Sequence, residues 1–287
     1  MKGLQSNRRT ITLITVVLCC AGAVTTQAQD TKLKWFGHAA FSITTPRGRI
    51  ILIDPWINNP VNPEAKDGKD ALVAIDRADY ILLTHGHRDH VGDAVAIARK
   101  THAILICNPE LAANLVKLAD FPAKEAQSEY IMQIGSEVKI AEGEVTVAMT
   151  AAIHSSSVFN AKAGPNEPER AYGGSPAGFV IIVRNGPTIY HSGDTAYFRD
   201  MEVIGETYPI DVALINISAM GPKMSAKAAQ SLRARLVIPH HFGTFAGLLP
   251  DAGEFTTELR KLKIDSYEMK PGETAFFRGR QLIKSRQ

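Results

Sequence analysis

The sequence predicts an α/β fold, and a four-layer αβ/βα sandwich is the arrangement that fits it. Short apolar runs with the length of buried strands alternate with helical segments along most of the chain. A faint internal repeat also divides the chain into two similar halves, which would pack sheet against sheet with helices outside. Strand–turn–strand patterns also recur by chance, so from the repeat alone a chance similarity is an equal alternative.

The expected elements follow from the positions of the apolar residues, taken in chain order. Strands are expected at 32–35, 40–44, 50–53 and 80–84. A helix at 93–100, a strand at 103–107 and a second helix at 111–118 follow. Residues 137–140 and 145–148 are expected to form a hairpin around Glu142-Gly143, where glycine suits the turn.

The internal repeat is visible in two pairs of segments. Residues 41–48 and 179–186 each begin with phenylalanine and end with glycine. Each is followed by a largely apolar run that ends at an acidic residue, Asp54 in the first half and Asp194 in the second. An aspartate followed by four apolar residues then recurs at 79–83 and 211–215. Each half-unit would form one sheet of the sandwich.

The most informative segment is residues 84–90, Thr-His-Gly-His-Arg-Asp-His, at the end of an apolar strand. Imidazole and carboxylate groups are the usual ligands of zinc and similar divalent metals. Where the chain stays extended, His85 and His87 point the same way and can reach one metal. Asp89 and His90 are adjacent and point apart, so at least one of them suits a second metal. A polar loop with histidines by chance is the alternative.

Further ligands are expected where other strand-like runs end, because one cluster cannot fill two metal sites. His154, Asp194 and one of His240 and His241 each follow such a run. The pattern of residues does not choose between His240 and His241. The alternatives are a capping or core histidine at position 154 and a turn aspartate at position 194.

Three more residues are candidates to support the site or to contact substrate. Asp54 follows a buried strand and could accept the second ring proton of a histidine ligand. His38 and His191 could face the cleft, but for each a satisfied core histidine is an equal alternative. His102 begins an apolar strand and is expected to be structural.

Two long segments without periodicity, 55–70 and 155–177, directly follow Asp54 and His154. Loops of this length inside a compact domain are usually functional or disordered. We expect them to form walls of a substrate cleft, with plain surface excursions as the alternative.

Residues 1–28 have the features of an export signal. A basic start precedes an apolar run at 11–24, which is too short to span a bilayer comfortably, and Thr26-Gln27-Ala28 is an acceptable cleavage site. A signal anchor that stays attached is the alternative, and Arg8-Arg9 leaves the Sec or twin-arginine route open. The sequence therefore predicts an exported protein, periplasmic or secreted, with residues 29–287 as a single domain.

Composition limits the partners of that domain. The chain has 32 basic and 29 acidic residues, and the basic excess lies within residues 1–28, so residues 29–287 are close to neutral. This balance argues against nucleic acid as a partner. Removal of the signal leaves Cys107 as the one cysteine, which excludes an intramolecular disulfide. We expect a small-molecule substrate and no membrane association after cleavage, and the oligomeric state stays open.

The His-x-His-x-Asp-His pattern is the signature of the metallo-β-lactamase superfamily, and the chain resembles that superfamily. The motifs at 35–39, 51–55, 190–195 and 239–245 add to the resemblance. Together they resemble the branch of metal-dependent hydrolases that includes ascorbate-6-phosphate lactonase, over roughly residues 32–280. The resemblance implies the four-layer sandwich of the superfamily and so supports that arrangement here.

Carried over position by position, the resemblance implies a centre of two divalent ions, with zinc as the first candidate and manganese or iron as alternatives. It selects His241 over His240 because the family places the ligand directly before an aromatic residue, here Phe242. Residues 216–222 depart from the branch, being shorter and lacking an acidic residue, which leaves substrate specificity open. The implied ligands are His85, His87 and His154 for the first metal, Asp89, His90 and His241 for the second, and Asp194 as a bridge.

The expected activity is hydrolysis of a small ester, lactone or phosphodiester by a hydroxide that bridges the two metals. Asp89 is the expected catalytic residue, because it could orient the hydroxide and receive a proton. An exported β-lactamase is an alternative. The resemblance argues against it, because β-lactamases lack the bridging aspartate that Asp194 would supply. Nucleic-acid-processing members carry extra domains, for which the chain leaves no room. A non-catalytic metal-binding or partner-binding module is the alternative from another class.

Overall fold

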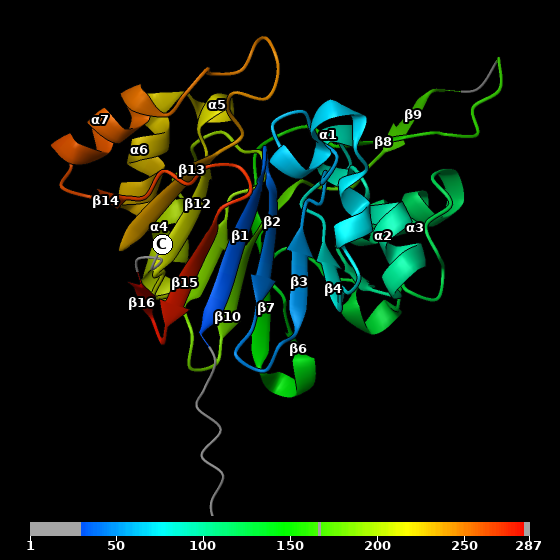
Figure 1. The fold of residues 1–287 in the computed structure, drawn as a ribbon, viewed down its shortest axis with the longest axis horizontal. Helices are drawn as coiled ribbons and strands as arrows, with labels where there is room; N and C mark the ends of the chain where they lie inside the picture. Colours follow the sequence, from blue (N-terminus) through cyan, green and yellow to red (C-terminus); the bar gives the residue numbers. More distant parts are fainter. Residues whose placement is uncertain (1–29, 166–167, 284–287) are drawn as a thin grey trace, which may run out of the picture.

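In the computed structural model, which describes residues 30–165 and 168–283, two seven-stranded sheets lie face to face (Figure 1). The strand order of the first sheet is β16 (Gln281–Ile283), β15 (Thr274–Arg278), β1 (Thr31–Gly37), β2 (Ala40–Thr44), β3 (Ile50–Ile53), β4 (Tyr80–Leu82) and β5 (Ile104–Ile106). The order of the second is β14 (Asp265–Ser266), β13 (Leu236–His240), β12 (Val212–Asn216), β11 (Thr188–His191), β10 (Ala177–Val183), β7 (Val145–Ala151) and β6 (Glu137–Ile140).

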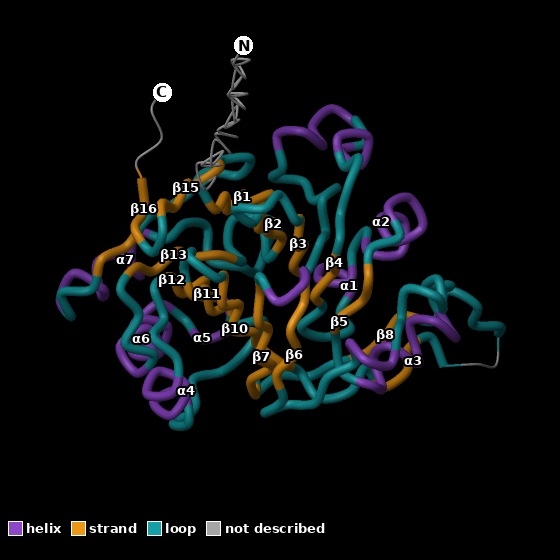
Figure 2. The backbone as a smooth tube through the Cα atoms, turned by 90° about the horizontal axis from the view of Figure 1, so that it is seen from below, coloured by secondary structure: helices purple, strands orange, loops and turns teal. Residues whose placement is uncertain are grey.

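Helices cover the outer face of each sheet, which Figure 2 shows from below. The helices beside the first sheet are α1 (Arg88–Val91), α2 (Ala94–Thr101) and α3 (Pro109–Leu118). Those beside the second sheet are α4 (Met201–Thr207), α5 (Ile217–Met220), α6 (Pro222–Ser231) and α7 (Gly253–Lys261). None of the helices within the described residues has the length and apolar character needed to cross a membrane.

Three apolar clusters join these layers. The central cluster lies between the sheets and contains Trp35 of the first sheet and Phe179 of the second. Because alternate residues of a strand face opposite sides, Leu52 belongs to another cluster, with Leu115 of α3. Val180 likewise belongs to the third cluster, with residues of α6 and α7. Each sheet is therefore buried on both faces, and the predicted four-layer αβ/βα sandwich is confirmed.

The internal repeat in the sequence corresponds to a structural repeat. Strand β2 pairs antiparallel with β3, and β3 pairs parallel with β4. In the second sheet, β10 pairs antiparallel with β11, and β11 pairs parallel with β12. The two segments that begin with Phe41 and Phe179 thus occupy equivalent places in the two sheets.

The carboxyl ends of the site-bearing strands meet at one end of the sandwich. His38 follows β1, Asp54 follows β3, and the histidine-rich segment follows β4; the second sheet places His154 after β7 and Asp194 after β11. Backbone hydrogen bonds join the two edges here, from the Ala177 N–H to the Thr84 carbonyl at 2.9 Å and from the His241 N–H to the His38 carbonyl at 3.0 Å. The fold therefore brings the predicted site residues of both halves together.

The expected elements occur with shifted ends, and two segments differ from expectation. Residues 155–177, expected to be irregular, contain the small hairpin of β8 (Ser157–Phe159) and β9 (Arg170–Tyr172), which extends away from the sandwich (Figure 1). The loop 55–70 contains a short 3-10 helix, η1 (Pro63–Gly68). Three residues per strand are too few to give a visible alternation of apolar and polar residues.

Candidate metal centre

His85, His87 and His154 form a first group, whose ring nitrogens lie within 4.8 Å of one another. The backbone of His87 is still extended (φ −68°, ψ 150°) before α1 begins, so His85 and His87 point to the same side, as the spacing predicts. The His154 ring centroid lies 5.2 Å from that of His85 and 5.1 Å from that of His87. Two strands from different sheets thus supply one set of three imidazoles.

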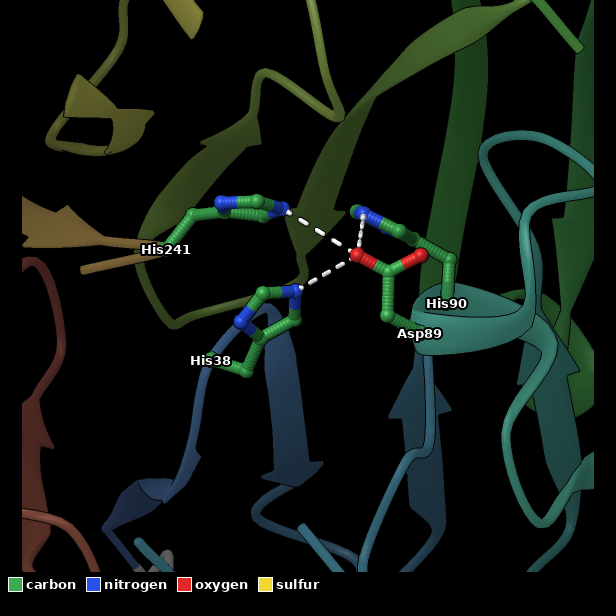
Figure 3. A group of neighbouring side chains, drawn as sticks. All are labelled: His38, Asp89, His90 and His241. Atoms are coloured by element: carbon green, nitrogen blue, oxygen red, sulfur yellow. Dashed lines mark hydrogen bonds and ion pairs between the residues drawn. The ribbon is translucent and has the colours of Figure 1, made fainter. Parts of the chain in front are cut away.

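His38, Asp89, His90 and His241 form a second group with ligand atoms within 4.8 Å of one another (Figure 3). Asp89 Oδ2 lies between the three rings, 3.0 Å from His38 Nε2, 3.6 Å from His241 Nε2 and 3.9 Å from His90 Nε2. Helix α1 supplies both Asp89 and His90, so the chain is no longer extended at this point. The structure places His38 directly within this group.

Asp194 lies between the two groups. Its Oδ1 atom is 3.3 Å from His90 Nε2, and its Oδ2 atom is 3.3 Å from His241 Nε2 and 3.5 Å from His154 Nε2. His85, His90 and Asp194 also offer a third set of atoms within 4.8 Å of one another. One carboxylate therefore faces histidines of both groups, which is the place that a bridging ligand would occupy.

Asp54 determines which ring nitrogens face the centre. Its Oδ2 atom accepts a hydrogen bond from His90 Nδ1 at 2.7 Å and another from the Thr84 hydroxyl at 2.7 Å. Because the Thr84 proton is used in this way, its oxygen accepts from His85 Nδ1, 3.0 Å away. Nδ1 thus carries a proton in both rings, and Nε2 is the atom that His85 and His90 would each offer to a metal.

Charges in the centre favour a cation between the carboxylates. Burial on its own lowers the pKa of His90, but Asp194 and Asp54 outweigh it and raise this pKa well above its usual value. Burial on its own raises the pKa of Asp194, and His90 and His241 hold it well below the usual range instead. Burial lowers the pKa of His85, so this ring is neutral. A divalent ion would supply the positive charge that the carboxylates favour.

The unpaired ring nitrogens show that these residues fit a metal. Among the described residues, the buried Nε2 atoms of His90 and His241 make no aligned hydrogen bond, although each faces a carboxylate oxygen of Asp194 at 3.3 Å. Buried polar atoms are rarely left without a partner. Ring nitrogens and carboxylate oxygens that converge without hydrogen bonding to one another are arranged to bind a shared cation. Nitrogen and carboxylate donors without thiolate suit zinc, manganese or iron.

Comparison with known proteins decides the family. Residues 49–242 match the family described as Beta-lactamase superfamily domain. The chain belongs to the metallo-β-lactamase superfamily. It is 40% identical over 250 residues to a UPF0173 metal-dependent hydrolase of Thermodesulfovibrio yellowstonii, a match that covers 85% of this chain and 91% of that protein. A UPF0173 metal-dependent hydrolase of Pyrobaculum aerophilum is 41% identical over 246 residues, with 84% and 98% covered.

A solved structure agrees with this assignment. Igni18, described as a novel metallo hydrolase from the archaeon Ignicoccus hospitalis, is 30% identical with a TM-score of 0.71, and the match covers 86% of this chain and 98% of Igni18. The protein is thus a metal-dependent hydrolase, and the predicted resemblance to the metallo-β-lactamase superfamily is confirmed. The narrower resemblance to ascorbate-6-phosphate lactonase stays a prediction.

The same comparisons contradict the prediction of a signal peptide and a periplasmic location, which was therefore wrong. The relatives include bacterial and archaeal metal-dependent hydrolases, and this kinship supports hydrolysis and metal binding but gives no support to an export signal. The interpretation depended on a basic start and an apolar run, a composition that is not specific to exported proteins. Residues 1–28 lie outside the described residues.

His191 and His240 belong to neither of the two histidine groups, although they lie close to them. His191 Nδ1 accepts a hydrogen bond from the Gly193 N–H at 3.0 Å, and Nε2 donates to the Ala39 carbonyl at 3.2 Å. Its ring stacks on that of His240 with centroids 4.7 Å apart. Both rings are fully buried. His102 is exposed and pairs with Glu125 at 2.9 Å, away from the site.

Three residues that support the site were not among the candidates named from the sequence. Thr84 relays the contact between Asp54 and His85, and the Thr244 hydroxyl lies 3.0 Å from His38 Nδ1. Asn216 donates a hydrogen bond to Asp194 Oδ1. Each contact joins residues that are adjacent in space and, for two of the three, distant in sequence. The position of Asn216 at the end of a predicted apolar strand was the available hint.

Proposed function

We propose that the protein hydrolyses a small ester, lactone or phosphodiester with two divalent ions, one held by each histidine group. His85, His87 and His154 would hold the first ion, and Asp89, His90 and His241 the second. The observation that carries the proposal is the position of Asp194, whose two oxygens face histidines of both groups at 3.3–3.5 Å. A shared carboxylate would keep both ions close together, as two-metal hydrolysis requires.

Bound ions would supply an activated water as nucleophile and positive charge for the electrophilic oxygen. The protein itself would position the proton acceptor. The side chain of Asp89 is 28% exposed, whereas those of Asp54 and Asp194 are 0% and 7% exposed. Asp89 is therefore the carboxylate of the three that an incoming water can reach, and its place next to His38 Nε2 fixes its orientation.

The neighbours of Asp89 also keep it ionised. Burial on its own raises the pKa of Asp89, but His241 and His38 hold it well below its usual value. His38 itself is neutral, because burial lowers its pKa to about 4. With one ring proton, His38 either donates to Asp89 or donates to Thr244 and offers Nε2 as a further metal ligand. In both cases it holds the second group together.

The test is a substrate panel with metal-loaded protein, metal-free protein and the Asp89→Asn variant. The panel contains simple esters, γ-lactones, a phosphodiester and nitrocefin. We expect metal-dependent turnover of an ester, a lactone or the phosphodiester, with kcat reduced at least about 100-fold in Asp89→Asn, the scale of a lost general base. Turnover of nitrocefin alone would overturn the substrate assignment in favour of a β-lactamase. Full metal content without turnover of any substrate would identify a non-catalytic metal-binding module.

A further inference from the structure

Two aromatic side chains lie against the buried His38 ring at the edge of the second group. The Phe245 ring is 47% exposed, with its centroid 5.6 Å from that of His38. The Trp56 ring lies edge-on to the His38 ring, with centroids 5.2 Å apart, and Trp56 is only partly buried. His38 is fully buried, and its ring lies 3.7 Å from that of His241. An exposed aromatic surface thus lies directly beside candidate metal ligands.

Within the described part of the chain, no lysine or arginine forms an ion pair with Asp89 or Asp194, and both carboxylates pair only with histidines. Arg88, adjacent to Asp89 in sequence, instead places its guanidinium 4.7 Å from the Phe159 ring. Apart from the proposed ions, a free carboxylate or phosphate on the substrate would find no cationic partner among these side chains, whereas an apolar group would find two rings.

We propose that Phe245 and Trp56 bind an aromatic group of an uncharged ester or lactone, on the side of the centre formed by His38 and His241. This inference rests on the proposed hydrolase function and names its substrate class. Aromatic rings attract one another at centroid separations of about 4.5–7 Å, so the exposed Phe245 ring and the partly buried Trp56 ring could both contact an aromatic group beside the centre. Phe245 lies on a short loop between Gly243 and Gly247, both of which have positive φ.

The test compares three substrates of the metal-loaded protein: benzyl acetate, methyl acetate and the charged analogue 4-carboxybenzyl acetate. We expect kcat/KM to be highest for benzyl acetate and about 10-fold or more lower for its charged analogue. Phe245→Ala should lower the ratio of benzyl to methyl acetate kcat/KM about 10-fold, mainly through KM, at unchanged metal content. Val203→Ala is the control for loss of an exposed apolar side chain, because Val203 is 57% exposed on α4, outside the segments expected to line the cleft; it should leave the ratio unchanged.

Binding separates this inference from the proposed function. Saturation-transfer NMR should show benzyl alcohol bound to the wild type and lost in Phe245→Ala, even if no ester is cleaved. An unchanged benzyl-to-methyl ratio in Phe245→Ala, or benzyl alcohol binding that persists in that variant, would overturn the inference. Binding without turnover would retain it and reject the hydrolysis of esters.

A second inference concerns Asn216, the last residue of β12, which is fully buried. Its Oδ1 atom accepts hydrogen bonds from the Ser218 and Ala219 N–H groups at 2.9 Å each and caps α5. This fixes the amide plane, because the reverse orientation would set the NH2 group against two N–H donors. The Nδ2 atom consequently donates to Asp194 Oδ1.

The geometry points to Asn216 as a positioning residue for the bridging carboxylate. The contact uses one side of Asp194 Oδ1 and holds the carboxylate plane so that Oδ2 faces His154 and His241. Groups that orient metal ligands in this way typically contribute 10- to 100-fold to metal affinity. Residues 216–222 thus support the centre even though they lack an acidic residue.

The test separates positioning from helix capping. Asn216→Ser keeps a cap oxygen but loses the donor, and we expect about 10- to 100-fold weaker metal affinity in chelator competition. Asn108→Ser is the matched control: Asn108 caps α3 and donates to the Gly173 and Ser175 carbonyls. The Asn108→Ser variant should have a lower Tm in the metal-free protein and an unchanged metal affinity. Wild-type metal affinity in Asn216→Ser would reduce Asn216 to a cap.

Discussion

The Asp54 carboxylate and the His90 imidazole are both fully buried and share a hydrogen bond of 2.7 Å. The same carboxylate oxygen holds the Thr84 hydroxyl, which lies next to His85 Nδ1. One buried carboxylate therefore orients a histidine in each of the two groups. Its loss should disturb both metal sites together, unlike the loss of a single ligand.

Asp54→Asn should weaken metal binding about 10- to 100-fold while the fold persists. Asparagine suits the position because Asp54 has a positive φ of 44°, a conformation that asparagine tolerates. Both carboxylate oxygens accept hydrogen bonds, Oδ1 from the Thr84 N–H and Oδ2 from His90 and the Thr84 hydroxyl, so in either orientation the amide sets its NH2 group against a donor. Chelator competition followed by elemental analysis measures the effect. Metal affinity equal to that of the wild type would show that ring orientation in the centre does not depend on Asp54.

His241→Ala and His240→Ala should differ sharply. His241 Nε2 lies within 3.6 Å of both Asp89 and Asp194, whereas His240 is buried against His191. We expect His241→Ala to lose the second metal and nearly all hydrolysis. His240→Ala should keep both metals and lose stability, by about 2–4 kcal/mol for a buried ring replaced by a cavity. Metal analysis and urea unfolding distinguish them, and the reverse pattern would exchange the two roles.

Asp194→Asn should lower kcat by several orders of magnitude, because a bridging carboxylate helps to assemble the nucleophile. The amide keeps the shape of the side chain and loses the negative charge that faces His90 and His241. At least one metal should bind more weakly. If Asp194→Ala retained two metals and near-normal turnover, Asp194 would be a turn residue, and hydrolysis of nitrocefin would become the expected activity.

Asp79 provides a test of stability away from the centre. Burial on its own raises its pKa, but hydrogen bonds from the Ile50 N–H, Arg77 and Arg49 hold the pKa below its usual value. A lowered folded-state pKa stabilises the protein above the unfolded value, near pH 4, and this contribution is lost as pH falls through the folded pKa.

Asp79→Asn should therefore reduce the free energy of unfolding by about 1 kcal/mol at pH 7, once solvent screening is allowed for. The difference from the wild type should shrink below about pH 4. Urea unfolding across pH measures it. Asp76→Asn is the control, since the Asp76 side chain is 90% exposed and pairs only with Lys100. A difference between Asp79→Asn and wild type that does not change with pH would contradict this explanation.

The sequence predicted the fold and the clustering of the site residues because both depend on local patterns. Apolar runs identify strands, and a run that ends in histidine or aspartate places that residue at the strand's carboxyl end. The repeat around Phe41 and Phe179 was ambiguous in the sequence, and it became decisive only once the pairing of β2–β4 and β10–β12 was known.

Contacts between distant segments could not be predicted in the same way. Asn216 and Asp194 are 22 residues apart, and His38 and Thr244 are 206 apart. Their pairing depends on strand order, which periodicity does not specify. His38 was assigned equally to the core or the cleft for this reason. Residues 1–28 gave the opposite error, since a local composition was taken to specify a location in the cell.

The most direct test of a two-metal centre is the metal content of the purified protein after growth in metal-supplemented medium. The wild type should hold close to two divalent ions per chain, because two groups of ligand atoms share Asp194. His87→Ala should lose most of the metal of the first group. Only trace metal in the wild type, or wild-type metal content in His87→Ala, would contradict the account.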